Sequence, residues 1–252
     1  MRYALKIAYD GTNYSGWQVQ NNAITVQQIV EEKLFELVGE KTSVVASGRT
    51  DAGVHALGQV CHVDLSTTIP AEKLADALNV KLPQDIRVMA SSQAPENFDA
   101  NRSAKKKTYV YKTYFSPRQN PLLDRYATWI KGEPDLVKLE ECARLFVGEH
   151  DFKAYCASRS QVKTTTRTVF YVDVLTQVQG DATLVNFYVC GNGFLYNMVR
   201  TMVGTILFYS LGRLSLDDVK ASINLGDRTL VGKTMPANAL TLQSVDYGID
   251  IF

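Results

Sequence analysis

The order of strand and helix patterns constrains the fold more than any other feature of this sequence. Two strand-like runs, Arg167–Val178 and Ala182–Cys190, are separated only by the short turn QGD, which is typical of a hairpin. Helical patterns stand between other strand-like runs, but they do not alternate strictly with strands as they do in parallel α/β folds. The sequence therefore predicts an α+β fold in which an antiparallel sheet is flanked by helices.

The first half of the chain begins with a strand, a loop and a helix. Apolar and polar residues alternate from Tyr3 to Tyr9, as in a half-buried strand. Thr25 and Gln28 form a capping-box pattern ahead of an apolar helical stripe that stops at Gly39. Beyond this helix we expect strands at 44–46, 58–65 and 86–92, and a helix at 70–80 with proline in its first turn.

A second half begins near residue 105, where the letters TYVYKTYF (108–115) alternate again in a strand pattern. Helices are predicted at 136–147 and 195–211, followed by a shorter helix capped by Ser215 and a last strand at 240–247. We therefore predict two similar α+β halves, residues 1–104 and 105–252, with a central cleft between them.

Cysteine spacing and glycine-rich loops indicate no bound cofactor. The four cysteines are far apart and lack CxxC or Cys/His ligand spacing, so neither a zinc site nor a disulfide framework is expected. The phosphate-binding pattern GxxxxGK[ST] is absent, and GNGF lacks the third glycine of a dinucleotide fingerprint. We expect no metal and no nucleotide cofactor, and we interpret Cys61, Cys142, Cys156 and Cys190 as buried thiols of a cytoplasmic protein.

Neither the N-terminus nor the most apolar segment has the pattern of a membrane or export signal. The letters MRYALKIAYDG alternate like a strand and lack the three regions of a signal peptide. The apolar segment Phe194–Leu211 is interrupted by Asn197, Arg200 and Gly204, so its apolar runs are too short for a membrane span. We expect a buried helix there and no contact with a membrane.

Basic residues are distributed unevenly, although the net charge is only +1. Residues 101–118 contain six basic side chains and residues 152–172 contain four, and neither stretch contains an acid. A solvated surface is the commoner explanation of a charge run, but tyrosines interleaved with these residues favour a nucleic-acid groove. If the stretches line an RNA path, charge reversal at Lys105–Lys107 should weaken substrate binding and flatten its salt dependence.

The segment ASGRTDAGVHALGQ (46–59) groups Arg49, Asp51 and His55 between glycines. Asp beside Gly most often closes a turn, and His55 is interpreted as a structural hydrogen-bonding residue. Arg200 is the sole charge of its apolar helix, so a partly buried guanidinium there needs a carboxylate partner. Asp51 is the candidate, because a nucleophilic carboxylate in a dry site is kept ionised by a cation. The alternatives are an Arg200 that reaches solvent at the helix edge, or a core ion pair without a catalytic role.

Five blocks of sequence follow one another along almost the whole chain. They are YDGTNYSGWQVQ (9–20), SGRTDAGVHALGQV (47–60), FDA followed by SAKKKTYVY (98–111), GEHDF (148–152) and GNGFLYNMVRTMVGT (191–205). Together they resemble the TruA family of tRNA pseudouridine synthases. This resemblance implies the pseudouridine synthase fold and an isomerase that converts uridine to pseudouridine in the anticodon stem-loop of tRNA, at positions 38–40. It also implies a homodimer whose second copy helps to bind tRNA.

The resemblance assigns roles to four residues. Asp51, within GRTDAGVHA, stands at the catalytic position, and Tyr109, the first tyrosine of TYVY, is expected to lie against the target uracil. Arg200 is expected to pair with the catalytic carboxylate, and Arg49 to hold the flipped nucleotide out of its stack. The first half would then carry the catalytic loop, and the second half the stacking tyrosine and the pairing arginine.

One turn departs from the family pattern. Where the family has a sequence close to FHARFSA, this chain has FDANRSA at 98–104. Asp99 replaces the usual histidine, and Asn101 and Arg102 stand where arginine and phenylalanine follow. The departure leaves the contacts of this turn open.

The implied reaction explains why these residue types are needed. Breaking the C1′–N1 bond, turning the uracil and rejoining it through C5 adds and removes nothing overall, so no cofactor is required. A paired base must first be extruded at a cost of a few kcal/mol, and stacking on an aromatic ring such as that of Tyr109 returns about 1–3 kcal/mol. Attack of the carboxylate at C1′, its addition to C6, and a route through a glycal intermediate all remain compatible with the residues.

Two other functions compete with this interpretation. A nucleoside or glycoside hydrolase needs a second carboxylic acid or a metal to activate water, and Asp10 is the only distant candidate that we identify for the second acid. A non-catalytic RNA-binding module would explain the basic stretches but would leave Asp51 and Arg200 without a purpose.

Overall fold

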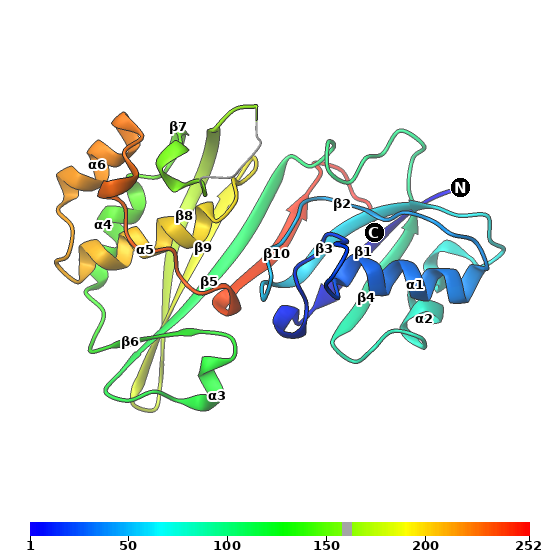
Figure 1. The fold of residues 1–252 in the computed structure, drawn as a ribbon, viewed down its shortest axis with the longest axis horizontal. Coiled ribbons are helices and arrows are strands. Elements are labelled where there is room, and N and C mark those ends of the chain that lie inside the picture. The colour runs from blue at the N-terminus through cyan, green and yellow to red at the C-terminus, as the bar shows by residue number, and fades with distance from the viewer. Residues whose placement is uncertain (158–162) are drawn as a thin grey trace. The chain divides into compact units, whose positions relative to one another are not determined.

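The structure, a computed structural model, describes residues 1–157 and 163–252 and divides the chain into two compact units (Figure 1). The first unit comprises Met1–Lys107 and Thr241–Phe252, and the second comprises Thr108–Leu240. The chain leaves the first unit within strand β5 (Lys106–Ser116) and returns to it at the start of strand β10 (Leu240–Asp246). Each unit combines strands with helices, as the sequence predicts for an α+β fold.

The sheet of the first unit has the strand order β4-β1-β3-β10, and β2 also pairs with β3. The central strand β1 is antiparallel to both neighbours, with Ala4 opposite His62 on one side and Ser92 on the other. Strand β10 runs parallel to β3, with Thr241 opposite His55. The elements are β1 (Arg2–Tyr9), α1 (Val26–Val38), β2 (Val45–Ala46), β3 (His55–Asp64), α2 (Leu74–Asn79) and β4 (Ile86–Gln93).

Helix α1 forms where the sequence predicts it. The Thr25 hydroxyl accepts a hydrogen bond from the Gln28 N–H at the start of the helix, and Gly39 ends it with a φ of 77°, which glycine adopts without strain. Val26, Val30 and Leu34 are completely buried, so the predicted apolar stripe faces the core. The helix predicted at 70–80 is instead split into a short 3₁₀ turn, Ala71–Lys73, and α2.

The strand order of the second unit is β5-β9-β8-β7, with β6 parallel to β5. Strands β8 and β9 form the predicted hairpin around Gly180, whose φ is 63°. Helices α4 and α5 pack on each other, and α4 also packs on β8. The elements are α3 (Pro121–Asp124), β6 (Thr128–Lys131), α4 (Leu136–Arg144), β7 (Gly148–Asp151), β8 (Thr166–Gln179), β9 (Ala182–Gly191), α5 (Met198–Ser210) and α6 (Leu216–Leu225).

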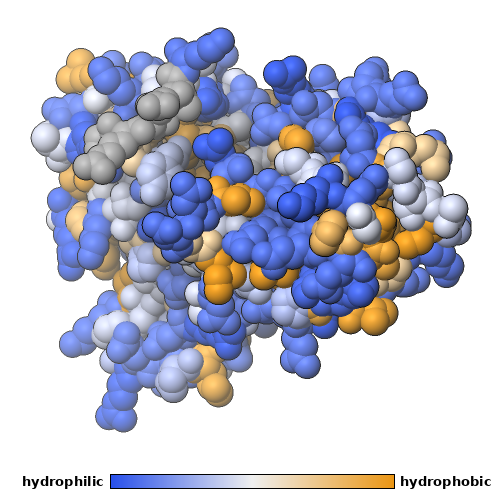
Figure 2. Space-filling view, turned by 45° about the vertical axis from the view of Figure 1, so that its right-hand side comes forward, coloured by the Kyte–Doolittle hydropathy of each residue, from blue (hydrophilic) through white to orange (hydrophobic). Residues whose placement is uncertain are grey.

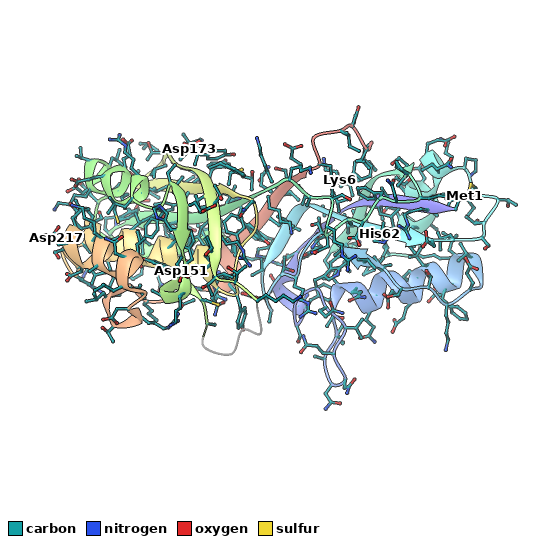
Figure 3. The ribbon with its side chains drawn as sticks, turned by 90° about the horizontal axis from the view of Figure 1, so that it is seen from above. Met1, Lys6, His62, Asp151, Asp173 and Asp217 are labelled. Carbon is teal, nitrogen blue, oxygen red and sulfur yellow. The ribbon has the colours of Figure 1, made fainter. Side chains whose placement is uncertain are left out.

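The block GEHDF forms β7 and the first residue of the turn after it, and Figure 3 labels Asp151, the last residue of β7. Asp151 Oδ1 accepts hydrogen bonds from the Lys153 N–H at 3.1 Å and from the Thr165 hydroxyl at 2.5 Å. Phe152 is completely buried, and its ring lies edge-on to that of Tyr155. The block therefore closes a turn and fills the core of the second unit.

The boundary between the units differs from the predicted division into 1–104 and 105–252. Residues 241–252 belong to the first unit, because β10 pairs with β3 and because Tyr247 packs against the turn that follows β4. The Tyr247 hydroxyl donates to the Ala100 carbonyl at 2.8 Å, and its ring lies edge-on to that of Phe98. The C-terminal strand thus completes the first unit rather than the second.

The cysteines are free thiols, and all four are buried. Burial raises the pKa of the Cys142 thiol to about 12, so this thiol stays protonated at neutral pH. In the described part of the chain, no helix is both long enough and apolar enough to cross a membrane. Hydrophilic residues cover most of the face drawn in Figure 2, and the hydrophobic residues on it are divided into small groups.

Candidate active site

The loop that carries Arg49 and Asp51 connects β2 to β3, and its first limb is anchored at Ser47. The Ser47 N–H donates to the Val60 carbonyl at 2.7 Å, and its hydroxyl donates to Gln59 Oε1 at 2.7 Å. The Gln59 amide in turn donates to the Gly48 carbonyl at 2.9 Å. Ser47 and Gln59 are both completely buried, so the backbone immediately before Arg49 has a fixed path.

The second limb of the loop is anchored at Thr50. The hydroxyls of Thr50 and Tyr9 lie 2.7 Å apart, and the Trp17 N–H donates to the Thr50 carbonyl at 3.1 Å. Burial raises the pKa of Tyr9, so its hydroxyl keeps its proton. The Val54 N–H donates to the Asp51 carbonyl at 3.1 Å, so the backbone of Asp51 itself closes a tight turn. Asp51 is half-buried and Arg49 is exposed.

Glycines of the block YDGTNYSGWQVQ allow this loop to be packed against backbone. A Cβ atom on Gly16 would lie 2.4 Å from the Thr50 carbonyl oxygen, and one on Gly11 would lie 2.0 Å from that of Val54. Any larger residue would displace the loop at either position. The sequence pattern marks this block but does not reveal its role, because the contact joins segments about 40 residues apart.

His55 is a buried structural residue, as the sequence interpretation has it. Its Nδ1 atom accepts a hydrogen bond from the Gly11 N–H at 3.0 Å and lies 3.1 Å from Asp10 Oδ1. Asp10 also accepts from the Thr12 N–H at 3.0 Å. Asp10, the candidate second acid of a hydrolase, therefore contacts His55 and the turn that follows β1.

The turn at 98–103 shows what the departure from the family pattern does. Asp99 Oδ1 accepts hydrogen bonds from the N–H groups of Arg102 and Asn101, each at 2.9 Å. These bonds hold the pKa of Asp99 below its ordinary value. The Ser103 hydroxyl accepts from the Asp99 N–H at 3.2 Å. Asp99 thus acts as an ionised cap that shapes the turn.

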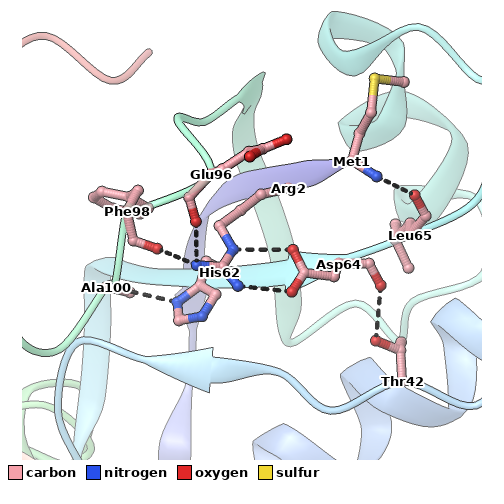
Figure 4. Close-up of polar contacts among 9 residues, drawn as sticks. All are labelled: Met1, Arg2, Thr42, His62, Asp64, Leu65, Glu96, Phe98 and Ala100. Atoms are coloured by element: carbon pink, nitrogen blue, oxygen red, sulfur yellow. Dashed lines mark hydrogen bonds and ion pairs between the residues drawn. The ribbon is translucent and has the colours of Figure 1, made fainter.

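The same turn is attached to β1 and β3 (Figure 4). His62 Nδ1 accepts the Ala100 N–H at 3.0 Å, and burial, with a further contribution from Arg2, lowers the pKa of His62. Arg2 donates to the carbonyl oxygens of Glu96 and Phe98 at 2.8 Å each. The backbone of this segment is therefore fixed at Glu96, Phe98 and Ala100.

Two side chains from this region reach the loop that carries Asp51. The Asn101 amide and the Lys107 ammonium both donate to the Ser47 carbonyl oxygen, each at 2.5 Å. Arg49, Asp99 and Asn101 also line one open pocket, to which Trp17 and Arg102 contribute as well. Sequence reasoning leaves Asn101 and Lys107 without a role on the loop, because a hydrogen bond across 54 or 60 residues leaves no local pattern.

Tyr109 lies on β5 in the second unit, and its side chain is held by an aromatic neighbour. It is 8% exposed, and its ring lies edge-on to that of Phe194, with a centroid distance of 5.3 Å and an interplanar angle of 89°. Phe194 belongs to the block GNGFLYNMVRTMVGT. The block therefore contains both Arg200 and the aromatic residue that contacts Tyr109.

Arg200 lies in the first turn of α5 and is half-buried. Its Nε donates to the Met235 carbonyl at 2.7 Å, and its Nη1 donates to Asn197 Oδ1 at 2.7 Å. Asn197 caps α5 in the left-handed conformation, with a φ of 64°, so the helix begins at Met198 rather than at 195. These two bonds set the direction of the guanidinium.

The four predicted site residues belong to different units. Arg49 and Asp51 share one loop of the first unit, whereas Tyr109 and Arg200 lie in the second. Asp51 is expected to lie close to Arg200 and to Tyr109. Each of these pairs would combine residues of different units, and both stay predictions. No group of three or more His, Cys, Asp or Glu side chains in residues 1–157 and 163–252 could hold a metal ion.

Comparison with known proteins identifies the class. The profile of a family described as tRNA pseudouridine synthase matches residues 6–101 and 142–248. These segments contain Arg49, Asp51 and Arg200, while Tyr109 lies between them. The fold and this match define an RNA-modifying isomerase.

Curated relatives agree over nearly the full length of the chain. Proteins named tRNA pseudouridine synthase A from Ruminiclostridium cellulolyticum and Geotalea uraniireducens are 40% and 42% identical, each covering 96% of this chain and 98% of the relative. The protein of that name from Shouchella clausii is 41% identical and covers 100% of this chain and 95% of the relative. The chain belongs to the tRNA pseudouridine synthase family.

Proposed function

We propose that this chain converts uridine to pseudouridine in the anticodon stem-loop of tRNA, with Asp51 as the catalytic carboxylate. Family membership supports the reaction, and the anchored loop that carries Asp51 is the observation on which the site assignment depends. Hydrogen bonds at Ser47 and Thr50 fix the backbone on both sides of Arg49. A carboxylate on such a loop keeps its position while a flipped nucleotide enters.

Each proposed residue has one task in this reaction. Arg49 holds the extruded nucleotide out of its stack, and Tyr109 receives the uracil ring by stacking. Asp51 acts as nucleophile, and Arg200 keeps it ionised away from water. The C1′–N1 bond breaks, a C1′–C5 bond forms, C5 loses a proton and N1 gains one, so that atoms and charge balance without a co-reactant.

Several properties of the substrate complex belong to the same proposal. The basic stretches 101–118 and 152–172 line the RNA path, although Arg159 of the second stretch lies outside the described residues. The enzyme acts in the cytoplasm as a homodimer whose second copy helps to bind tRNA, as the resemblance to the TruA family implies. Light scattering of the purified chain, alone and with tRNA, tests the dimer.

The reaction is tested with purified chain and tRNA that carries tritium at C5 of uridine, with no added cofactor. The proposal expects tritium release into water and pseudouridine at mapped positions of the anticodon stem-loop. A hydrolase would instead release free uracil, and a binding module would release neither product. Either of these results would overturn the proposal.

Replacing Asp51 with Asn tests the assigned nucleophile. The amide retains the shape of the side chain but cannot act as a carboxylate, so we expect tritium release to fall below detection. The dissociation constant for tRNA should remain within about threefold of wild type, because Asp51 contributes little to phosphate binding. Substantial activity in Asp51→Asn would show that the nucleophile lies elsewhere.

A further inference from the structure

The carbonyl oxygen of Ser47 is the point at which the turn at 98–103 and the start of β5 meet the loop that carries Asp51. The Asn101 Nδ2 atom and the Lys107 Nζ atom each lie 2.5 Å from this oxygen. A carbonyl oxygen has two lone pairs, so these two donors use its full accepting capacity. The oxygen thus receives one neutral and one charged donor from segments distant in sequence.

Ser47 is bonded at every polar atom. Besides its carbonyl, its N–H donates to Val60 and its hydroxyl donates to Gln59. The residue has no exposed surface, so a shift of its backbone would leave buried polar groups without partners. Arg49 lies two residues further along the chain and Asp51 four, so the position of Ser47 sets the start of the limb that carries both.

Asn101 is held so that its amide meets this oxygen. Its own N–H is bonded to Asp99 Oδ1, and the preceding residue, Ala100, is held by His62 and Tyr247. The residue as a whole is exposed, so its side chain adds little to the core. An exposed side chain on a turn whose backbone is fixed by hydrogen bonds is better suited to positioning a partner than to stabilising the core.

Lys107 adds the second donor at the boundary of the unit. It is the last residue of the first unit, and Tyr109 follows two residues later on β5. The Ser47 carbonyl therefore ties the place where the chain leaves the first unit to the loop that carries Asp51.

We propose that Asn101 is a positioning residue for catalysis: its side-chain amide, together with Lys107, holds the Ser47 carbonyl and so fixes the limb that places Arg49 and Asp51 against bound tRNA. This inference rests on the proposed function of Asp51. It assigns a role to a position at which the chain departs from the family pattern.

The decisive variant is Asn101→Asp, which retains the size of the side chain but turns the donor into a carboxylate that repels the Ser47 carbonyl. We expect the single-turnover rate of tritium release at saturating enzyme to fall tenfold to about a hundredfold, as for a catalytic group displaced by about 1 Å. The dissociation constant for tRNA should match that of the equally charged control Asn97→Asp to within about twofold. Asn101→Gln retains an amide donor and should recover the rate to within about threefold of wild type.

Asn97→Asp is the matched control. Asn97 is an exposed asparagine of the same connection, and its replacement adds the same charge without touching the loop. It should have the wild-type rate. The expected split between rate and binding separates a positioning role from a merely structural one, which would lower the melting temperature without changing the single-turnover rate of the folded protein.

A double-mutant cycle with Lys107→Met tests the shared oxygen. Asn101→Ala and Lys107→Met each leave one donor on the Ser47 carbonyl, whereas the double variant leaves none. We expect the double variant to lose more rate than the product of the two single losses. Losses that merely multiply would show that the two donors act independently and would overturn the shared role.

The remaining outcomes are also decisive. A wild-type rate in Asn101→Asp would overturn the inference. A loss confined to tRNA affinity would also overturn it, because Asn101 would then be a direct RNA contact. If Asn101→Asp does not fold, Asn101→Ala takes its place with an expected loss of about fivefold. A wild-type chain that binds tRNA but releases no tritium would refute the proposed function instead.

Discussion

Three residues of the turn at 98–103 show how single side chains set local geometry. Asp99 caps two N–H groups and stays ionised, Asn101 donates to the loop that carries Asp51, and Ala100 is held through its backbone. The sequence marks this turn as a departure from the family pattern. It does not reveal the partners of Ala100 and Asn101, because their hydrogen bonds reach residues distant along the chain.

His62 should make the first unit sensitive to acid. Burial lowers its pKa, with Arg2 adding to that effect and Asp64 and Asp99 opposing it. At a pH above its ordinary pKa of about 6.5, His62 is neutral in both the folded and the unfolded chain. As the pH falls through that value the unfolded chain binds a proton that the folded chain does not, so stability falls until the pH reaches the lowered folded pKa.

The variant that tests this prediction is His62→Asn, whose side-chain oxygen can still accept the Ala100 N–H. We expect the free energy of unfolding to fall less between pH 7 and pH 5 in this variant than in wild type, as measured by urea denaturation at each pH. Identical losses in the two proteins would contradict a protonation effect at His62.

Individual helices and strands agree with the prediction where the sequence contains a clear helix cap or hairpin turn. Helix α1 begins after Thr25 and ends at Gly39, and α6 begins with a complete capping box at Ser215. The β8–β9 hairpin is antiparallel as predicted, whereas β10 pairs with β3 and β6 pairs with β5 in parallel, so the strand pairing is mixed. The predicted start of α5 is three residues too early, because Asn197 adopts a left-handed conformation that helix propensity does not predict. Strands β6 and β7 and helix α3 are too short to stand out by period.

Gly204 in α5 is required by a close approach of backbone. A Cβ atom there would lie 1.9 Å from the Lys233 carbonyl oxygen, in the segment that also holds Arg200 through Met235. Helix propensity alone would favour alanine by about 1 kcal/mol, but overpacking at such a contact costs about 1–3 kcal/mol or more.

We therefore expect Gly204→Ala to lower the free energy of unfolding by about 2 kcal/mol and to shift the guanidinium of Arg200. Gly193→Ala is the control, because a Cβ atom there meets nothing closer than 3.7 Å. Urea denaturation of the two variants measures the free energy of unfolding and shows whether the overpacking cost at Gly204 exceeds the gain in helix propensity. Stabilisation by Gly204→Ala would show that the segment at 231–235 gives way easily.

At the scale of the whole molecule, the uneven distribution of charge is the property most relevant to an RNA substrate. Lys105 and Lys106 are exposed, whereas Lys107 is half-buried and bonded to Ser47. Charge reversal at all three positions would mix weaker phosphate binding with damage to the loop. The structure therefore restricts the electrostatic test to the first two lysines.

The double variant Lys105→Glu/Lys106→Glu should weaken tRNA binding. The logarithm of the association constant should also fall less steeply with the logarithm of the salt concentration, by about one unit of slope for each lysine that pairs with a phosphate in the wild-type complex. The control Lys41→Glu/Lys73→Glu makes the same change in net charge at exposed positions of the same unit. Filter binding over a range of salt concentrations measures both slopes. Equal slopes in the two variants would place the RNA path elsewhere.

Reading along the chain identifies the periods of strands and helices, their caps, the hairpin turn, and the residue types grouped in the loop around Asp51. Each of these is set by interactions across a few residues, so local pattern suffices. Two features emerge from the folded chain alone: residues 241–252 complete the first unit, and Asn101 and Lys107 meet at the Ser47 carbonyl. Such contacts depend on how distant segments pack, and a backbone oxygen bonds in the same way to any donor that packing brings within reach.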